Sequence, residues 1–244
     1  MNAIEIRGLR KEYKDTVAVD GLTLDVREGE LFSLLGVNGA GKSTTVKMLA
    51  TLVKPTSGDA LLLGKSLVEE PGEIKGSIDV SMQETAIARK LTVEENIDFY
   101  AALSGMNAAE IAEAKREIYR ALSLDQVASK QAAKLSGGWQ RKLSIALALV
   151  TRPKILFLDE PTLGLDVLAR RDLWKVISAL KGEMTIILTT HYMEEAEALS
   201  DRIGIMDRGR LLFVGSKEEL FAATGKANVE EAFIEIVSGG QNNA

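Results

Sequence analysis

The residues with the clearest chemical pattern run from Gly36 to Ser43 and read Gly-Val-Asn-Gly-Ala-Gly-Lys-Ser. They follow a continuous apolar run, Leu31–Leu35, and precede a helix-compatible run, Thr44–Leu49. Glycines at these spacings let successive backbone N–H groups surround a phosphate, and the following helix directs its positive N-terminus at the anion. Lys42 would reach the β- and γ-phosphates of a nucleotide, and Ser43 can ligate Mg²⁺. A glycine-rich turn that only joins strand to helix is the alternative, and the complete pattern disfavours it.

Two adjacent carboxylates supply a second chemical feature. The apolar run Ile155–Leu158 ends in Asp159 and Glu160. Acids at the carboxyl end of a sheet strand lie where ligands bind in open α/β sheets. Asp159 can hold Mg²⁺ through water, and Glu160 can orient or deprotonate an attacking water molecule. A solvated strand end before a turn at Pro161 is the alternative, which the neighbouring phosphate-binding pattern makes less favourable.

The elements that must position these residues alternate between strands and helices. The pattern predicts half-exposed antiparallel strands near the start of the chain and buried strands later. The expected strands are Ala3–Ile6, Leu22–Val26, Leu31–Leu35, Ala60–Leu63, Ile78–Met82, Ile155–Leu158, Thr185–Thr189 and Ile203–Met206. Helical patterns between the later strands, such as Val167–Leu180, predict an α/β fold with a mostly parallel sheet covered by helices on both faces.

The stretch from 84 to 152 differs because it holds three helical patterns and no convincing strand. Capping boxes predict helices that start after Thr92 and Asn107, and Ser136 can cap a third helix that ends before Pro153. We therefore expect one domain over residues 1–244. Residues 1–83 and 153–215 would form the catalytic core with an antiparallel β subdomain, 84–152 an inserted helical subdomain, and 216–244 a short C-terminal helical tail.

Composition narrows the possible functions. The 244 residues carry a formal charge of −5 and contain no cysteine, which excludes disulfides, thiolate metal sites and a cysteine nucleophile. An acidic chain is a poor candidate for coating nucleic acid by charge, so no nucleic-acid partner is expected. No apolar run approaches the roughly 18–20 residues of a membrane span. Any histidine chemistry must use His191, since the chain has one histidine.

The run Leu135-Ser136-Gly137-Gly138, followed by basic residues and an apolar helix, resembles the signature of ATP-binding cassette (ABC) proteins. Six motifs then match the family's order, over a stretch from roughly Ala3 to Gly215. After the phosphate-binding loop (Walker A), these are Gln83 (Q-loop), Leu135–Gly138 (signature), Asp159–Glu160 (Walker B), Gly164–Asp166 (D-loop) and His191 (switch histidine). The resemblance implies a P-loop NTPase that binds ATP and Mg²⁺ and hydrolyses ATP.

The resemblance also implies a head-to-tail dimer with ATP between the two subunits. Ser136 and the N–H groups of Gly137 and Gly138 open a helix, and the glycines let the partner's γ-phosphate come close. Asp166 would contact the opposite subunit. A homodimer is plausible because both halves of the site look intact, and a heterodimer with a related cassette stays open.

Three further assignments depend on the resemblance, and one residue departs from it. Tyr13 lies where the family stacks an aromatic ring on adenine, although such a tyrosine is often just packing. Gln83 would ligate Mg²⁺ or sense the γ-phosphate, although a lone glutamine is usually solvated. His191 would hydrogen-bond to phosphate and to Glu160, although a lone histidine is usually structural. Trp139 departs from the family, which usually has glutamine there.

The predicted site is as follows. The catalytic residues are Lys42, Glu160 and His191; the nucleotide-binding residues are Tyr13, Gly36, Asn38, Gly39, Ala40, Gly41, Lys42, Ser43, Thr44, Gln83, Ser136, Gly137, Gly138, Asp159 and Asp166; the metal ligands are Ser43, Gln83 and Asp159. Two other features are assigned no chemistry. Trp174 is expected to pack in the core, and the acidic run 194–197 is expected to be a solvated helix face.

The partners expected from the resemblance are a second ABC ATPase subunit and separate integral membrane permeases, docked between Gln83 and about Tyr100. The chain would then lie peripherally at the cytoplasmic face of the membrane. Thr190–Ala196 and Val229–Val237 look like the ATPase subunits of ABC-2-type exporters, the drug-resistance-like group. The short stretch after Gly215 favours export weakly, because importer ATPases often carry a C-terminal regulatory domain.

Two rival functions remain at this stage. The first is a soluble cassette protein that acts on ribosomes or DNA, although such relatives usually carry tandem cassettes or a long coiled coil, and this chain shows neither. The second is a binding module with an inactive site, which intact Lys42, Glu160 and His191 oppose. The cargo cannot be read from this chain, because permease residues would recognise it.

Overall fold

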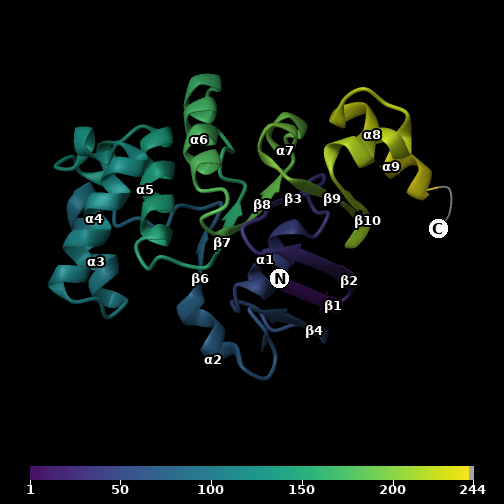
Figure 1. Cartoon of the computed structure of the whole chain (residues 1–244), viewed down its shortest axis with the longest axis horizontal. Helices are drawn as coiled ribbons and strands as arrows, with labels where there is room; N and C mark the ends of the chain where they lie inside the picture. The colour runs from purple at the N-terminus through teal and green to yellow at the C-terminus, as the bar shows by residue number, and fades with distance from the viewer. Residues whose placement is uncertain (242–244) are drawn as a thin grey trace.

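Two β-sheets and a group of helices make up the chain (Figure 1). The computed structural model describes the backbone of residues 1–241 and the side chains of residues 1–239. The predicted α/β class is confirmed, with a mostly parallel core sheet and an antiparallel N-terminal sheet.

The larger sheet has six strands in the order β10-β9-β3-β8-β7-β6. Their bounds are β3 Leu31–Leu35, β6 Ile78–Ser81, β7 Ile155–Asp159, β8 Thr185–Thr190, β9 Arg202–Asp207 and β10 Arg210–Gly215. All neighbours pair in parallel except β10, which is antiparallel to β9 and was not predicted. The carboxyl ends of β3, β7 and β8 therefore meet at one edge of the sheet, where the functional motifs begin.

The smaller sheet has the order β2-β1-β4-β5 and is antiparallel. Its strands are β1 Asn2–Tyr13, β2 Thr16–Arg27, β4 Ser57–Leu62 and β5 Lys65–Ser66. The first two are longer than the predicted Ala3–Ile6 and Leu22–Val26. The sequence pattern missed their outer parts because the pairing shifts register between Ile6 and Leu9, and β-bulges interrupt the inside–outside alternation.

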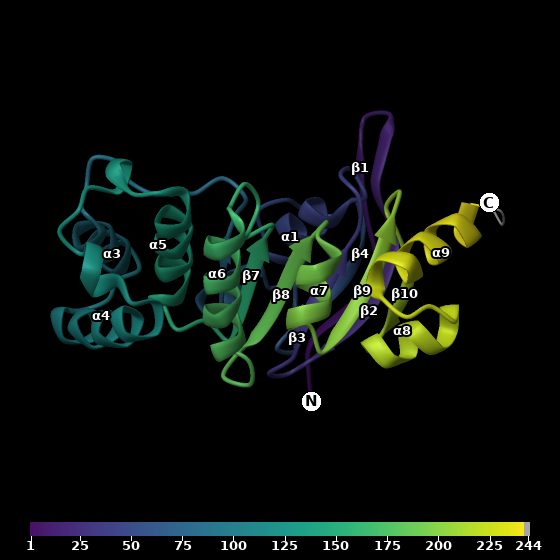
Figure 2. The same cartoon turned by 90° about the horizontal axis from the view of Figure 1, so that it is seen from above.

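Helix α1 (Lys42–Leu49) packs between the two sheets. Its Val46 and Met48 share a core with Ile4 of the small sheet and with Phe32 and Phe157 of the large one. The other face of β7 and β8 is covered by α6 (Val167–Ala179) and α7 (Met193–Leu199) (Figure 2). Both faces of the central strands are therefore buried, which explains their continuous apolar runs.

Residues 84–152, all of which the structure describes, contain one isolated β-bridge and no strand. They hold α3 (Val93–Leu103), α4 (Ala108–Leu122) and α5 (Gly137–Leu149), which gather at one end of the molecule (Figure 2). The capping boxes predicted at Thr92 and Asn107 are both formed. Ser136 is the N-cap residue of α5, but its side chain makes no capping hydrogen bond within the described chain.

The remaining helices are α2 (Pro71–Ile74), α8 (Lys217–Thr224) and α9 (Val229–Gln241), and short 3₁₀ turns lie at Lys75–Ser77, Leu124–Val127 and Ala132–Lys134. Helices α8 and α9 pack against Leu35, Ile203 and Ile205 of the large sheet. Residues 242–244 of the predicted tail lie outside the described residues. Within the described part of the chain, no helix is both long and apolar enough to span a membrane.

Candidate functional site

A pocket of about 590 Å³ opens beside the carboxyl ends of β3, β7 and β8. Eleven of the sequence-predicted site residues line it: Tyr13, Asn38, Gly39, Ala40, Gly41, Lys42, Ser43, Thr44, Gln83, Glu160 and His191. These residues come from the tip of the β1–β2 hairpin, the β3–α1 loop and the ends of three strands. The parallel sheet brings them together because its strand ends share one edge.

The loop between β3 and α1 holds its shape only with glycine at two positions. Gly41 has φ +103°, and a Cβ atom there would lie 2.3 Å from the carbonyl oxygen of Ala18. A Cβ atom at Gly36 would lie 2.3 Å from the carbonyl oxygen of Met206. The loop therefore wraps closely over neighbouring backbone, and α1 begins directly after it with its N-terminus at the pocket.

A buried lysine lies beside the carboxylate predicted to act on water. Lys42 is 4% exposed and its Nζ donates to the carbonyl oxygens of Gly36, at 2.8 Å, and Val37, at 3.1 Å. The same Nζ lies 3.4 Å from Oε1 of Glu160. Burial lowers the pKa of Lys42, and the charges of Glu160 and Asp159 offset this only in part. The ammonium group is thus held at the loop by backbone and is available to an anion.

Glu160 also contacts the single histidine. Nδ1 of His191 lies 3.0 Å from Oε2 of Glu160, and the two residues directly follow the neighbouring strands β8 and β7. Glu160 itself has φ +47°, an uncommon conformation for a residue with a side chain. Such strained backbone gathers at functional sites, where the surroundings hold it in place. Its N–H is anchored by the carbonyl oxygen of Thr189 at 3.1 Å.

Oxygen ligands of the kind that Mg²⁺ prefers lie at the start of α1. The hydroxyl of Ser43 donates to Oδ1 of Asp159 at 2.9 Å, and the hydroxyl of Thr189 donates to the same oxygen at 2.5 Å. Asp159 is 1% exposed. A hydroxyl and a buried carboxylate, with the Gln83 amide in the same pocket, form a donor set that fits Mg²⁺.

Five residues that line the pocket were missed by sequence reasoning: Thr16, Val17, Ala18, Leu163 and Arg208. Arg208 is the charged one among them. Arg208 lines the pocket from the β9–β10 turn and has φ +45°. The turn reaches the phosphate-binding loop because the N–H of Gly209 donates to the carbonyl oxygen of Ala40 at 2.9 Å. The only signal was the turn-forming run Asp-Arg-Gly-Arg, whose position in space depends on the unpredicted strand β10.

The signature residues and Asp166 do not line the pocket of their own chain. The start of α5, which carries the signature, lies close to the start of α6, which follows Asp166. A Cβ atom at Gly138 would be 3.1 Å from Cβ of Ala169 in α6. Asp166 caps α6 by accepting hydrogen bonds from the N–H groups of Leu168, at 3.0 Å, and Ala169, at 2.9 Å. Trp139 packs partly buried on the helical core, with Nζ of Lys142 4.7 Å from its ring centroid.

Two buried charged groups near the site have contacts that the sequence did not indicate. Arg141 of α5 donates to the carbonyl oxygens of Met82, at 2.8 Å, and Gln83, at 2.7 Å. Glu195, expected on a solvated helix face, is instead fully buried. That expectation is wrong because α6 covers α7, and Nε1 of Trp174 donates to Oε1 of Glu195 at 3.0 Å. Trp174 therefore packs as expected and also carries a polar contact.

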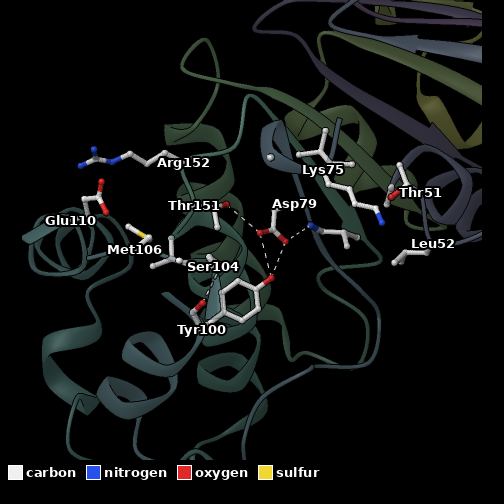
Figure 3. Close-up of a pocket in the computed structure, with 16 residues that line it drawn as sticks. Thr51, Leu52, Lys75, Asp79, Tyr100, Ser104, Met106, Glu110, Thr151 and Arg152 are labelled. Atoms are coloured by element: carbon white, nitrogen blue, oxygen red, sulfur yellow. Dashed lines mark hydrogen bonds between the residues drawn. The ribbon is translucent and has the colours of Figure 1, made fainter. Parts of the chain in front are cut away.

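A second hollow, of about 810 Å³, lies beside β6, the edge strand of the larger sheet (Figure 3). It is bordered by the end of α1, by β6 and by helices α3, α4 and α5. At its floor, Asp79 accepts hydrogen bonds from the hydroxyls of Tyr100, at 3.3 Å, and Thr151, at 3.2 Å. Burial raises the pKa of Asp79, and burial together with this carboxylate raises the pKa of Tyr100 to about 12.

Comparison with known proteins identifies the family. A family model described as "ABC transporter" matches residues 19–163, more than half of the chain. The chain belongs to the ABC transporter family. As a member of this ABC family it is an ATP-binding, ATP-hydrolysing domain, in agreement with the resemblance found in the sequence.

Individual ABC relatives agree. The chain is 41% identical to the daunorubicin/doxorubicin resistance ATP-binding protein DrrA of Streptomyces peucetius, over 91% of this chain and 68% of that protein. It is 39% identical to the probable multidrug ABC transporter ATP-binding protein YbhF of Escherichia coli, over 96% of this chain but 41% of that protein. A solved dimeric ATP-binding cassette in a post-hydrolysis state, bound to ADP and Pi, is 25% identical with a TM-score of 0.78, over 87% of this chain and 98% of that one.

Replacing Arg141 with alanine is expected to destabilise this ABC domain and slow its ATP hydrolysis. The partly buried hydrogen bonds to the carbonyl oxygens of Met82 and Gln83 would be lost, at a cost of about 1–3 kcal/mol, and the segment that carries Gln83 would loosen. Urea denaturation should show the lower free energy of unfolding, and an ATPase assay should show a rate about ten-fold lower. Arg116→Ala, on an exposed position of α4, is the control. Unchanged stability and rate for Arg141→Ala would contradict the role given to this contact.

Proposed function

We propose that the chain is the ATPase subunit of an ABC exporter, which closes as a dimer around ATP and acts on separate membrane permeases. The observation that carries this proposal is the convergence of Lys42, Glu160 and His191 beside a loop built to hold phosphate. An inactive binding module would have no need of this arrangement. The similarity to ATP-binding proteins named for drug resistance and multidrug transport supports export.

Within one subunit, the loop from Gly36 to Thr44 would bind the phosphates of ATP. Lys42 would contact the β- and γ-phosphates, and Tyr13, which is 44% exposed, would stack on adenine. Glu160 would accept a proton from the attacking water or hold that water in line. His191 would orient Glu160 through their 3.0 Å contact and hydrogen-bond to the γ-phosphate.

Mg²⁺ would be held by Ser43 and Asp159, with Gln83 as a further ligand. The short contact between the Ser43 hydroxyl and the Asp159 carboxylate supports this assignment. When bound, Mg²⁺ supplies positive charge that offsets the charge of the phosphate groups. When nucleotide binds, Gln83 would shift with it and move residues 84–152, the proposed helical subdomain. The link is the hydrogen bond from Arg141 to the carbonyl oxygen of Gln83.

The second subunit would supply Ser136, Gly137, Gly138 and Asp166 across the nucleotide. In this chain the four residues do not line their own pocket, and the side chains of Val167 and Leu168, which follow Asp166, are 63% and 80% exposed. Exposed apolar residues next to functional positions are typical of surfaces that bind a partner. We infer a homodimer, to which both halves of the site contribute, with a related cassette as the other possible partner.

The hollow in Figure 3 is where we propose that a permease segment docks. It lies between the core sheet and α3, so a segment held there would move when the helices move. Three apolar side chains near it are exposed: Leu52, which lines it, and Phe99 and Leu103 of α3, beside the lining residues Tyr100 and Ser104. Docking there would place the chain at the cytoplasmic face of a membrane.

The shared site is tested by mixing two inactive variants. Lys42→Ala removes the phosphate contact, and Ser136→Arg, at an exposed position, blocks the signature. Each variant alone should hydrolyse ATP poorly. An equimolar mixture should recover about a quarter of the wild-type rate, because half of the dimers are mixed and each mixed dimer has one intact site. No recovery by the mixture, with each variant folded, would contradict the shared site. Recovery of the chain from cells with ribosomes and no permease would contradict the transport role.

A further inference from the structure

Glu195 is a fully buried carboxylate for which the proposed reaction has no use. It is the third residue of α7 and follows His191 by one helical turn. It does not line the nucleotide pocket. Its neighbour Glu194 in the same helix is exposed. A buried carboxylate is costly unless it is paired, so its surroundings call for an explanation.

The surroundings of Glu195 are polar, and only one of its two carboxylate oxygens accepts a hydrogen bond within the described chain. Oε1 accepts a hydrogen bond from Nε1 of Trp174 at 3.0 Å. Within the described chain, three nearby buried atoms have no hydrogen-bond partner: Oε2 of Glu195, Oγ1 of Thr162 and Nε of Arg170. Burial raises the pKa of Glu195. The hydroxyls of Thr190 and Thr162, the Trp174 indole and the charge of Arg170 oppose this shift only in part.

The segments that meet at Glu195 are those that carry the proposed reaction. Thr162 lies in the loop after β7, between Glu160 and Asp166, and its carbonyl oxygen accepts from the N–H of Leu165 at 3.1 Å. Thr190 is the last residue of β8 and precedes His191. The carbonyl oxygen of Thr190 also accepts from the N–H of Gly36, at 3.3 Å, at the start of the phosphate-binding loop.

A second contact joins the same two segments. The guanidinium of Arg170, in α6, lies 4.4 Å from the ring centroid of Tyr192. The ring of Tyr192 lies 4.1 Å from the ring of His191. Asp166 is the N-cap residue of α6, which begins at Val167. The helix that follows the partner-facing loop is thus connected to the segment of His191 both through Glu195 and through Tyr192.

We propose that Glu195 is a positioning residue that holds the loop of Thr162 and Asp166 in register with His191. A partner subunit that engages Asp166 would then affect the geometry of His191 and Glu160 without touching either. This inference rests on the proposed function, because it needs Asp166 at the dimer contact and His191 at the γ-phosphate. Glu195 acts through those residues and does not contact nucleotide.

The first test compares Glu195→Ala, Glu195→Gln and the matched control Glu194→Ala. We expect Glu195→Ala to lower kcat about ten-fold or more with KM and ATP affinity within about three-fold of wild type, because the nucleotide contacts stay intact. Glutamine keeps the shape and an acceptor for Trp174, so kcat should return to within about three-fold of wild type. Glu194→Ala should match wild type. Equal kcat for wild type and Glu195→Ala would overturn the proposal.

A double-mutant cycle with His191→Ala separates positioning from general stability. If Glu195 acts through His191, Glu195→Ala should lower kcat by less than about two-fold in the His191→Ala background. Losses that multiply would show an independent, merely structural role and would overturn the proposal. A His191→Ala variant with wild-type kcat would instead contradict the role of His191 in the proposed function.

If Glu195→Ala does not fold, as judged by circular dichroism, Thr162→Val makes the same comparison. Valine has nearly the volume of threonine and removes one of the two hydroxyls that lower the pKa of Glu195. We expect kcat to fall about three-fold or more, again with little added effect in the His191→Ala background. A wild-type kcat for Thr162→Val would count against the link between the two segments.

Discussion

Glu160→Gln is expected to lower steady-state ATP hydrolysis by about 10²–10³-fold while ATP still binds. Glutamine has nearly the same shape as glutamate but cannot accept the proton of the attacking water. Its amide can keep the contacts that Glu160 makes with Lys42, at 3.4 Å, and His191, at 3.0 Å. The pocket should therefore stay assembled and fill with nucleotide, and the γ-phosphate should not be cleaved.

Two measurements check this result. A phosphate-release assay gives the rate, and sedimentation velocity with ATP and Mg²⁺ should show a stable dimer for Glu160→Gln and a mainly dissociated wild type after turnover. Glu183→Gln, the same change at an exposed turn position, should behave as wild type in both. Equal turnover by Glu160→Gln and wild type would remove Glu160 from the reaction, and a slow variant without a dimer would separate hydrolysis from dimer closure.

Lys42→Ala is expected to weaken ATP binding by about 10²-fold and to reduce hydrolysis below detection. Lys42 is held by the carbonyl oxygens of Gly36 and Val37, so its ammonium group is already oriented when nucleotide arrives. Its removal also takes the positive charge of Lys42 away from the buried carboxylates of Glu160 and Asp159. The site would then repel the phosphate groups that it must bind.

The dependence on the phosphates identifies the contact. A fluorescent-nucleotide competition assay should show large losses for ATP and ADP and little change for AMP, which lacks the β- and γ-phosphates. Lys47→Ala, in the last turn of the same helix, should keep wild-type affinity for all three. An AMP affinity that falls as much as that of ATP would indicate a distorted loop instead of a lost phosphate contact. Unchanged affinity throughout would contradict the phosphate-binding role of Lys42.

The parts of the fold that the sequence predicted correctly are those set by interactions between residues close together in the chain. Strand Leu31–Leu35 and the helices that begin after Thr92 and Asn107 agree with the structure, because apolar runs and capping boxes act over a few neighbouring residues. Bulged strands were predicted too short, because a bulge breaks the alternation on which the prediction depends. Strand β10 was missed because its place at the sheet edge is set by pairing with β9 and not by its own pattern.

For the site, the sequence alone determined the type of chemistry. The glycine spacing predicts a phosphate and metal site together with Lys42, Ser43 and the Asp159–Glu160 pair, because few other functions need these residue types in this pattern. The tertiary structure alone decided which further residues line the pocket or contact the segments around it. Arg208, Arg141 and Glu195 lie on segments with ordinary local patterns, and Glu195 even reads as solvated. Their roles arise from contacts between segments distant in sequence, because burial and charge pairing depend on what packs above a helix face.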